Sequence, residues 1–213
     1  MKVVVATSNR HKFEEIIGIF KNELASRNLI ADRLPLKLIS PRQIHVEFPW
    51  VDETGETLEE NALLKSKTFA KHFNMPAIAD DTGLFIDALD GRPGIFAARY
   101  AGEHSSYEDN NEKILIELQG VPLEKRTARF KTVVTLSFPD NRDDIVVDGT
   151  LDGHIALQYS GDSGFGYDPL FLIGEDKTLA DLSSEEKNSI SHRSIALKKI
   201  FDILIRMAVS PEI

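Results

Sequence analysis

Two adjacent aspartates, in the segment Asp80-Asp81-Thr82-Gly83, follow an apolar run at residues 76–79. Carboxylates this close repel each other unless a positive charge lies beside them. Mg²⁺ is a common partner, because it prefers oxygen ligands and often binds phosphates at the same time. A carboxylate beside such an ion can also accept a proton from an attacking water. The alternative is an Asx turn that only caps a neighbouring element, and the pair by itself leaves both interpretations open.

Basic residues begin two of the expected helices. The segment Thr7-Ser8-Asn9-Arg10-His11-Lys12 follows the first expected strand, and Ser191-His192-Arg193 begins the last expected helix. A helix N-terminus prefers acidic residues, so cations there are unfavourable unless an anion lies nearby. Free N–H groups at a helix start also bind anions. Two such starts favour a bound polyanion over two ordinary solvated helix ends.

A glycine-rich loop, Gly161-Asp162-Ser163-Gly164-Phe165-Gly166-Tyr167-Asp168-Pro169, carries two aromatic side chains. Glycine lets the backbone approach a ligand closely, and Phe165 or Tyr167 could stack on a planar base. Asp168 could accept hydrogen bonds from ring N–H groups. The alternative is a tight turn whose aromatic residues belong to the core. A serine-protease interpretation of Gly-Asp-Ser-Gly fails, because the matching upstream histidine segment is absent.

A further polar cluster, residues 53–56, leads into Asn61 and Lys65. These two residues lie four apart and share a helix face. Taken alone, they indicate a surface helix with an intrahelical polar pair. The sequence contains no Walker A motif and no Asp-x-Asp-x-Thr signature, which excludes several common phosphate chemistries.

Composition narrows the class of protein further. The 213 residues include 25 Lys plus Arg, 34 Asp plus Glu and no cysteine, for a formal net charge of −9. Disulfides, thiol nucleophiles and thiolate metal sites are therefore excluded. The acidic balance argues against binding of a nucleic-acid polymer. No apolar run is long enough for a membrane span or a signal peptide, so we expect a cytoplasmic protein with no membrane partner.

Hydrophobic periodicity places these motifs at the joints between elements. It predicts helices with one apolar face in the region 10–24 and over 57–72, 106–118 and 191–207. It predicts strands over 2–7, 76–79, 84–88 and just after 169, and a hairpin of 127–138 with 145–157 joined by 139–144. The expected class is α/β, with a mixed sheet flanked by helices.

Read in order, five motifs closely resemble the inosine/xanthosine triphosphate pyrophosphatase family. They are residues 6–12, Glu53-Thr54-Gly55 with Glu60-Asn61-Ala62 and Lys65, residues 79–83, residues 165–169 and residues 191–193. The resemblance extends from residue 3 to about residue 205. It implies one nucleoside-triphosphate pyrophosphatase domain over 1–213, built as an elongated mixed sheet in two lobes with the active site in a central cleft. It also implies a homodimer.

The resemblance implies hydrolysis of ITP, dITP and XTP to the monophosphate and pyrophosphate, with Mg²⁺ as cofactor and Mn²⁺ as a substitute. Asp81 would accept the proton from water. Glu53, Asp80 and Asp81 would hold the metal. The residues expected to bind the substrate are Thr7, Ser8, Asn9, Arg10, His11, Lys12, Lys65, Thr82, Phe165, Gly166, Tyr167, Asp168, Lys187, His192 and Arg193.

Two positions depart from the family pattern, which often has Gly where Ser8 stands and Ser where Thr82 stands. Both replacements keep or add a hydroxyl. Two other functions stay open: a related pyrophosphatase acting on modified pyrimidine nucleotides, and a non-catalytic nucleotide-binding protein.

Overall fold

The computed structural model describes residues 1–44, 48–140 and 142–209. The chain forms two compact units. Unit 1 comprises Met1–Asp81, Thr132–Gly149 and Arg193–Ile213, and unit 2 comprises Thr82–Lys131 and Thr150–His192. None of the helices in the described ranges is both long enough and apolar enough to cross a membrane.

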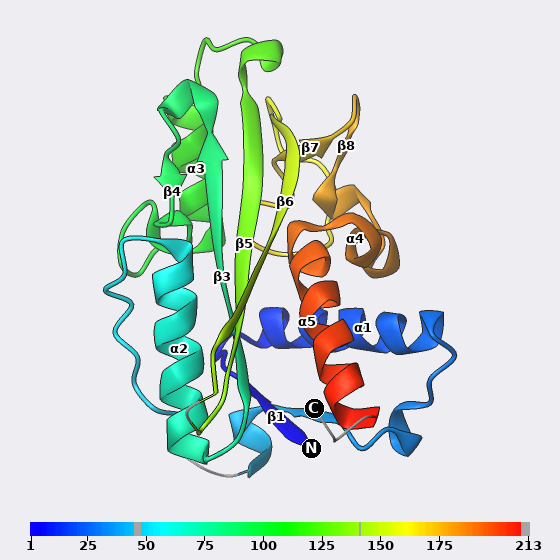
Figure 1. Cartoon of the computed structure of the whole chain (residues 1–213). Helices are drawn as coiled ribbons and strands as arrows, with labels where there is room; N and C mark the ends of the chain where they lie inside the picture. The colour runs from blue at the N-terminus through cyan, green and yellow to red at the C-terminus, as the bar shows by residue number, and fades with distance from the viewer. Residues whose placement is uncertain (45–47, 141, 210–213) are drawn as a thin grey trace. The chain divides into compact units, whose positions relative to one another are not determined.

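Helices and strands are interspersed along the chain (Figure 1). The helices are α1 (Arg10–Ser26), α2 (Leu58–Phe73), α3 (Tyr107–Glu117), α4 (Ser184–Ile190) and α5 (His192–Val209). The strands are β1 (Lys2–Val5), β2 (Lys37–Ile39), β3 (Ala77–Ile86), β4 (Pro93–Gly94), β5 (Thr127–Ser137), β6 (Ile145–Ile155), β7 (Phe171–Ile173) and β8 (Lys177–Thr178).

The strands are hydrogen-bonded in the order β2-β1-β3-β5-β6-β7-β8, with β4 added to β3. Within unit 1, β1 pairs in parallel with β2 and β3. Within unit 2, β4 is antiparallel to β3, and β7 is antiparallel to β6 and β8. The sheet is therefore mixed, and the expected α/β class is confirmed.

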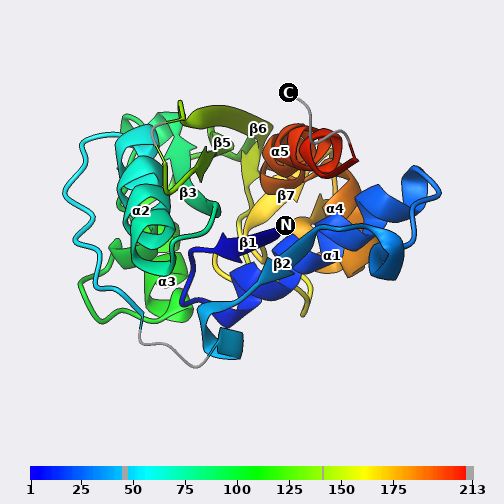
Figure 2. The same ribbon diagram turned by 60° about the horizontal axis from the view of Figure 1, so that its bottom comes forward.

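In unit 1, successive residues of β1 and β3 face opposite sides of the sheet. Val3, Val5 and Ile78 pack with the apolar faces of α1 and α5. Val4 and Ala79 pack with the apolar face of α2, together with Ala6 and Ala77. Figures 1 and 2 show α2 on one side of β1 and β3, and α1 and α5 on the other. Because side chains alternate along a strand, this layering decides which helix each β3 residue meets.

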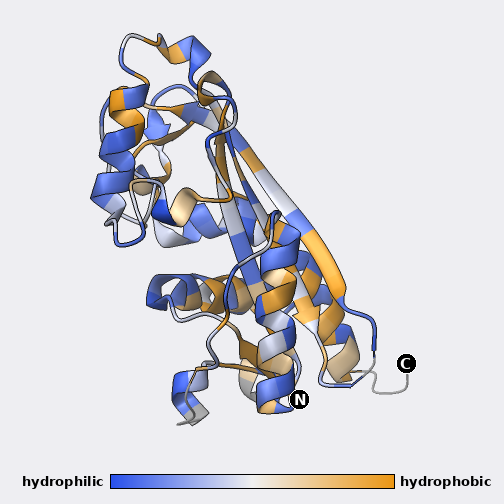
Figure 3. Ribbon diagram, turned by 90° about the vertical axis from the view of Figure 1, so that its left-hand side faces the viewer, coloured by the Kyte–Doolittle hydropathy of each residue, from blue (hydrophilic) through white to orange (hydrophobic). Residues whose placement is uncertain are grey.

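The helices of both units are amphipathic, and orange and blue residues share the same helices in Figure 3. Unit 2 has its own core, in which α3 contributes Ile114, β3 contributes Leu84 and Ile86, and β7 contributes Phe171. Ser106 caps α3 and forms a capping box with Asp109, which confirms the expected helix start.

One expectation about the elements is wrong. Residues 76–79 and 84–88 were expected as two strands on either side of the Asp80–Gly83 tetrad, but β3 continues without interruption from Ala77 to Ile86. Backbone hydrogen bonds build a strand, and the two carboxylates are tolerated because each has a cationic partner. Helix α4 was also missed, although Ser183 and Glu186 form the capping box that could have predicted it. The expected turn 139–144 includes residue 141, which lies outside the described residues.

Candidate active site

Asp80 and Asp81 are both buried in β3. Asp80 has the same parity as Ile78 and faces α1 and α5, whereas Asp81 has the parity of Ala79 and faces α2. Each carboxylate therefore meets a different set of cations, and no shared ion between them is required to offset their repulsion.

The Asp80 carboxylate lies in a buried ion cluster of unit 1. Its Oδ2 is 3.2 Å from Lys12 Nζ and 3.1 Å from Arg193 Nε. Arg193 Nη1 also donates to Glu15 Oε2 at 2.6 Å. Burial by itself would raise the pKa of Asp80, but the charges of Lys12, Arg193 and Lys65 lower that pKa far below its ordinary value. Asp80 thus remains a carboxylate and holds the two helix starts against β3.

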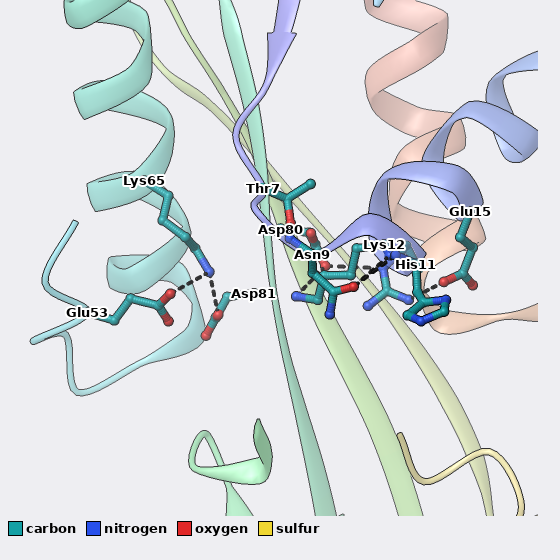
Figure 4. Close-up of polar contacts among 10 residues, drawn as sticks. Thr7, Asn9, His11, Lys12, Glu15, Glu53, Lys65, Asp80 and Asp81 are labelled. Atoms are coloured by element: carbon teal, nitrogen blue, oxygen red, sulfur yellow. Dashed lines mark hydrogen bonds and ion pairs between the residues drawn. The ribbon is translucent and has the colours of Figure 1, made fainter. Parts of the chain in front are cut away.

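On the other face of β3, the Lys65 ammonium lies between two carboxylates (Figure 4). Its Nζ donates to Asp81 Oδ1 at 2.6 Å and lies 3.5 Å from Glu53 Oε1. Burial alone would lower the pKa of Lys65, but Asp81, Glu53 and Asp80 raise it. Burial raises the pKa of Asp81, against the opposing charge of Lys65. A carboxylate with a raised pKa is a stronger proton acceptor than an ordinary one.

The loop that carries Glu53 is tied to the first turns of α2. Asn61 Oδ1 accepts from the Gly55 N–H at 2.8 Å, and Glu60 Oε2 accepts from the Glu56 N–H at 2.7 Å. A Cβ on Gly55 would lie only 2.7 Å from Asn61 Oδ1 and from Glu60 Cβ, so glycine is required there. Asn61 therefore holds the Glu53 loop in place. The sequence had indicated only a polar pair of Asn61 with Lys65 on one helix face.

At the start of α1, the Asn9 side chain accepts from the backbone N–H groups of His11 and Lys12 at 2.9 and 3.3 Å. Thr7 Oγ1 in turn accepts from the Asn9 N–H at 3.2 Å. Arg10 is exposed and pairs with Glu14 at 2.7 Å. The unfavourable cations of this helix start are thus partly neutralised by the protein's own carboxylates.

The charges of these two faces do not balance. Three cations (Lys12, Lys65 and Arg193) contact four carboxylates (Glu15, Glu53, Asp80 and Asp81). The Lys65 ammonium is a cation held by carboxylate oxygens of Glu53 and Asp81. A metal cation could be held by the same two carboxylates, because it prefers oxygen ligands. Asp80 faces the other way. Throughout the described ranges, no group of three or more His, Asp or Glu side chains could hold a metal ion unaided.

In unit 2, the carboxylate of Asp168 lies inside the glycine-rich loop. Its Oδ2 accepts from Lys187 Nζ at 2.6 Å and from the Phe165 N–H at 2.8 Å. A Cβ on Gly164, whose φ is +79°, would lie 2.1 Å from Asp168 Oδ2. Asp168 therefore determines the conformation of the loop. The Lys187 ammonium also lies 4.9 Å from the centroid of the Phe165 ring.

The two loop aromatics have different roles. Tyr167 is buried in the unit 2 core, and its hydroxyl donates to the Ala97 carbonyl at 2.7 Å. Phe165 is half-buried and lies 6.0 Å from the ring of Tyr107. The alternative of a core aromatic thus holds for Tyr167, while Phe165 retains partial exposure for stacking.

Comparison with known proteins places the chain in a family. A model of the Ham1 family matches residues 3–203. The chain belongs to the Ham1 family. The resemblance seen in the sequence is thereby confirmed.

Individual proteins and solved structures are also similar to this chain over nearly its whole length. A dITP/XTP pyrophosphatase of Thermoanaerobacter pseudethanolicus is 42% identical over 207 residues, covering 97% of this chain and 98% of the relative. The Staphylococcus aureus Ham1 structure is 40% identical with a TM-score of 0.78, and covers 96% of this chain and 98% of its own. A Mycobacterium abscessus structure described as a nucleoside-triphosphatase and dITP/XTP pyrophosphatase is 36% identical, with a TM-score of 0.70 and coverage of 96% and 100%.

Within this Ham1 chain, the expected residues fall into two groups. Unit 1 holds the residues of the first strand and helix start, together with Glu53, Lys65, Asp80, Asp81 and Arg193, and unit 2 holds Thr82, the 165–168 segment, Lys187 and His192. The His192 ring is buried and stacks on Phe130 with centroids 4.5 Å apart. The roles expected for these residues stay predictions.

The sequence analysis did not name Glu15 or Asn111, and it named Asn61 in a polar cluster and a family motif without assigning it a role in the site. Asn111 Nδ2 donates to the Gly166 carbonyl at 2.9 Å, which ties α3 to the glycine-rich loop. Buried amides on a helix face are a general signal of such anchoring, and Asn111 follows the predicted cap Ser106 closely. The Glu15–Arg193 contact joins residues 178 positions apart, and no local pattern predicts it.

Proposed function

We propose that this protein hydrolyses the non-standard purine nucleoside triphosphates ITP, dITP and XTP to the monophosphate and pyrophosphate, and so removes them from the nucleotide pool. The observation that carries the proposal is membership of the Ham1 family with 42% identity, over 97% of the chain, to a relative named dITP/XTP pyrophosphatase. The carboxylate and lysine pair of unit 1 supplies groups suited to such a reaction.

Unit 1 is assigned the phosphate end of the substrate. The side chains of Lys12 and Lys65 would neutralise phosphate oxygens, assisted by donors from the 7–11 segment. Lys65 now pairs with Asp81 and Glu53. Because those carboxylates would be shared with a metal ion, the ammonium is the group released toward an incoming phosphate. The assigned residues are Thr7, Ser8, Asn9, Arg10, His11, Lys12 and Lys65.

Glu53 and Asp81 are the proposed ligands of a divalent cation, Mg²⁺ or Mn²⁺. Hard oxygen donors suit both ions. When bound, the ion would polarise phosphate oxygens and lower the pKa of a bound water. The expectation that Asp80 is a further ligand stays a prediction; in the structure its Oδ2 contacts Lys12 and Arg193.

Asp81 is the proposed general base. Its carboxylate would take the proton of the water that attacks the α-phosphorus, and the bond from that phosphorus to the bridging oxygen would break as pyrophosphate leaves. A raised pKa, caused by burial, suits this role.

Unit 2 is assigned most of the base end. Phe165 would stack on the purine, while Gly166, Tyr167, Asp168 and Lys187 shape the loop around it, and Thr82 would contact the substrate. His192 and Arg193 would donate to the purine O6, where adenine carries an amino group instead. This difference favours 6-oxo purines over ATP.

The decisive experiment incubates the purified protein with a panel of purine and modified pyrimidine nucleoside triphosphates, with and without Mg²⁺, and identifies the inorganic product. We expect release of pyrophosphate from ITP, dITP and XTP that depends on the metal. Release of orthophosphate would contradict the proposed bond, preference for a pyrimidine would support the related pyrophosphatase, and binding without turnover would indicate a non-catalytic protein.

Two further properties belong to this proposal. We infer a homodimer from the family resemblance, and sedimentation equilibrium tests it. We infer a cytoplasmic location, with which a chain without cysteine is compatible, and fractionation of cells tests it.

A further inference from the structure

The first five residues of the segment 160–168, here called the nucleobase loop, are exposed and are therefore not fixed in place by packing in a core. Residues 160–164 are exposed, whereas Tyr167 and Asp168 are buried. Gly161, Gly164 and Gly166 all have positive φ, so the chain there is intrinsically free to adopt many conformations. Polar contacts must therefore hold the first half of the loop.

Those contacts come from a second segment, Thr178 to Asp181, here the clamp. Thr178 Oγ1 donates to the Ser160 carbonyl at 2.9 Å, and Ser160 Oγ donates to Asp181 Oδ1 at 2.9 Å. The Ser163 N–H donates to the Ala180 carbonyl at 3.1 Å. The Ala180 N–H donates to the Asp168 carbonyl at 3.2 Å. The clamp thus holds the loop at its beginning, middle and end.

Close packing accompanies these hydrogen bonds. A Cβ on Gly161 would lie 2.3 to 2.5 Å from backbone atoms of Ala180 and Asp181. The loop backbone therefore rests directly on the clamp backbone at this point. A displacement of the clamp would have to move the loop with it.

Asp181 is the centre of the clamp. Its Oδ2 accepts from the Thr178 N–H at 2.8 Å, which closes a capping box around residues 179–181. Its two oxygens also accept from Ser160 Oγ. An amide offers one acceptor oxygen instead of two, so Asn in this position can keep only part of the set. Because Asp181 is exposed, such a change creates no buried cavity.

We propose that Asp181 is a positioning residue for nucleobase recognition, acting through the clamp on the loop that carries Phe165. The proposal rests on the function proposed above, in which Phe165 stacks on the purine. Asp181 does not touch the base. It holds Ser160 and Gly161 so that Asp168 and Phe165 keep one arrangement, and it has no part in binding the phosphates.

The test measures binding of two separate probes, IMP and inorganic pyrophosphate, by calorimetry with Asp181→Asn, Ser160→Ala and the double variant. For Asp181→Asn we expect IMP affinity to fall about tenfold, the size of losing charge-assisted hydrogen bonds. Pyrophosphate affinity should stay unchanged. The kcat/KM for ITP divided by that for ATP should fall, because discrimination between the bases is weakened. Ser160→Ala removes only the contact that the two side chains share, so the double variant should resemble Asp181→Asn and fall short of the sum of the two single effects.

Controls separate the possible failures. Asp176→Asn removes the same charge from the neighbouring exposed turn and should leave both affinities unchanged, while Asp181→Glu keeps the carboxylate and should restore most of the IMP affinity. Phe165→Ala must weaken IMP binding if the base assignment is right, and no effect there overturns that assignment and the positioning role with it. If Phe165→Ala weakens IMP binding but Asp181→Asn does not, or if Asp181→Asn weakens both probes equally, the positioning role is wrong while the proposed function stands.

Discussion

Asp80 and Asp81 are neighbours in the chain but partners of different helices. Asp80 Oδ2 contacts Lys12 of α1 and Arg193 of α5, whereas Asp81 Oδ1 contacts Lys65 of α2. Because side chains alternate along β3, Asp80 forms buried ion pairs with two helices, whereas Asp81 lies on the other face and shares Lys65 with Glu53. The same substitution at the two positions should therefore give two different phenotypes.

Asp81→Asn should abolish most turnover with little loss of nucleotide binding. An amide cannot accept the proton of water, and general-base catalysis contributes roughly 10²- to 10⁴-fold in rate. Steady-state release of pyrophosphate from ITP and calorimetric binding of ITP measure the two properties. Full activity in this variant would disprove the general-base role.

Asp80→Asn should mainly destabilise the protein. It leaves Lys12 and Arg193 without their shared buried carboxylate, and breaking a buried ion pair costs about 3–5 kcal/mol. Urea unfolding of both aspartate variants, followed by circular dichroism, measures the loss. We expect a larger fall in unfolding free energy for Asp80→Asn than for Asp81→Asn. Asp80 contacts two cations, of which Arg193 keeps Glu15 and Lys12 loses the carboxylate it contacts, whereas Asp81 contacts Lys65, which still contacts Glu53. Equal stabilities would contradict this division.

Lys65→Met should strengthen binding of Mn²⁺ to the protein without nucleotide. The ammonium stands between Glu53 and Asp81, so a metal ion has to compete with it, and removal of a competing unit charge favours the ion. Calorimetric titration with Mn²⁺ alone measures the change. Lys67→Met on the same helix, whose lysine pairs with Asp144, is the matched control. Weaker Mn²⁺ binding in Lys65→Met would show that the lysine does not compete for this position.

Asp109 should make the stability of unit 2 depend on acid pH. Hydrogen bonds from the Ser106 backbone and hydroxyl hold the pKa of Asp109 below its ordinary value. A lowered pKa in the folded state means that this stability is present above about pH 4 and is lost as the pH falls further. The gap in unfolding free energy between the native chain and Asp109→Asn should therefore be constant near neutral pH and shrink in acid.

Urea unfolding at a series of pH values measures that gap. Glu108→Gln removes a charge from the same helical turn without altering the capping box, and it is the control. A gap that stays constant down to the lowest pH at which the protein folds would show that the capping carboxylate is not responsible.

Local patterns were enough to predict most of the elements and the family. Apolar spacing in residues 13–24 predicted α1, and Thr57 and Ser106 predicted the starts of α2 and α3, because helix faces and caps depend on residues only a few positions apart. The same logic failed at residues 80–83. A polar tetrad is typical of a turn, but cations supplied by α1, α2 and α5 stabilise it as the middle of a strand.

The partners of the charged groups required the tertiary structure. The basic start of α5 suggested a bound polyanion, and folding places Asp80 and Glu15 beside Arg193 instead. The glycine-rich loop suggested a base-binding site, but its contacts with the clamp join Ser160 to Thr178 and Asp181, 18 and 21 positions further along the chain. Backbone preferences and hydrophobic periodicity depend on residues a few positions apart, so the local sequence is enough to predict them. Ion pairs and loop anchors form between segments far apart in the chain, so packing of the sheet and helices decides them.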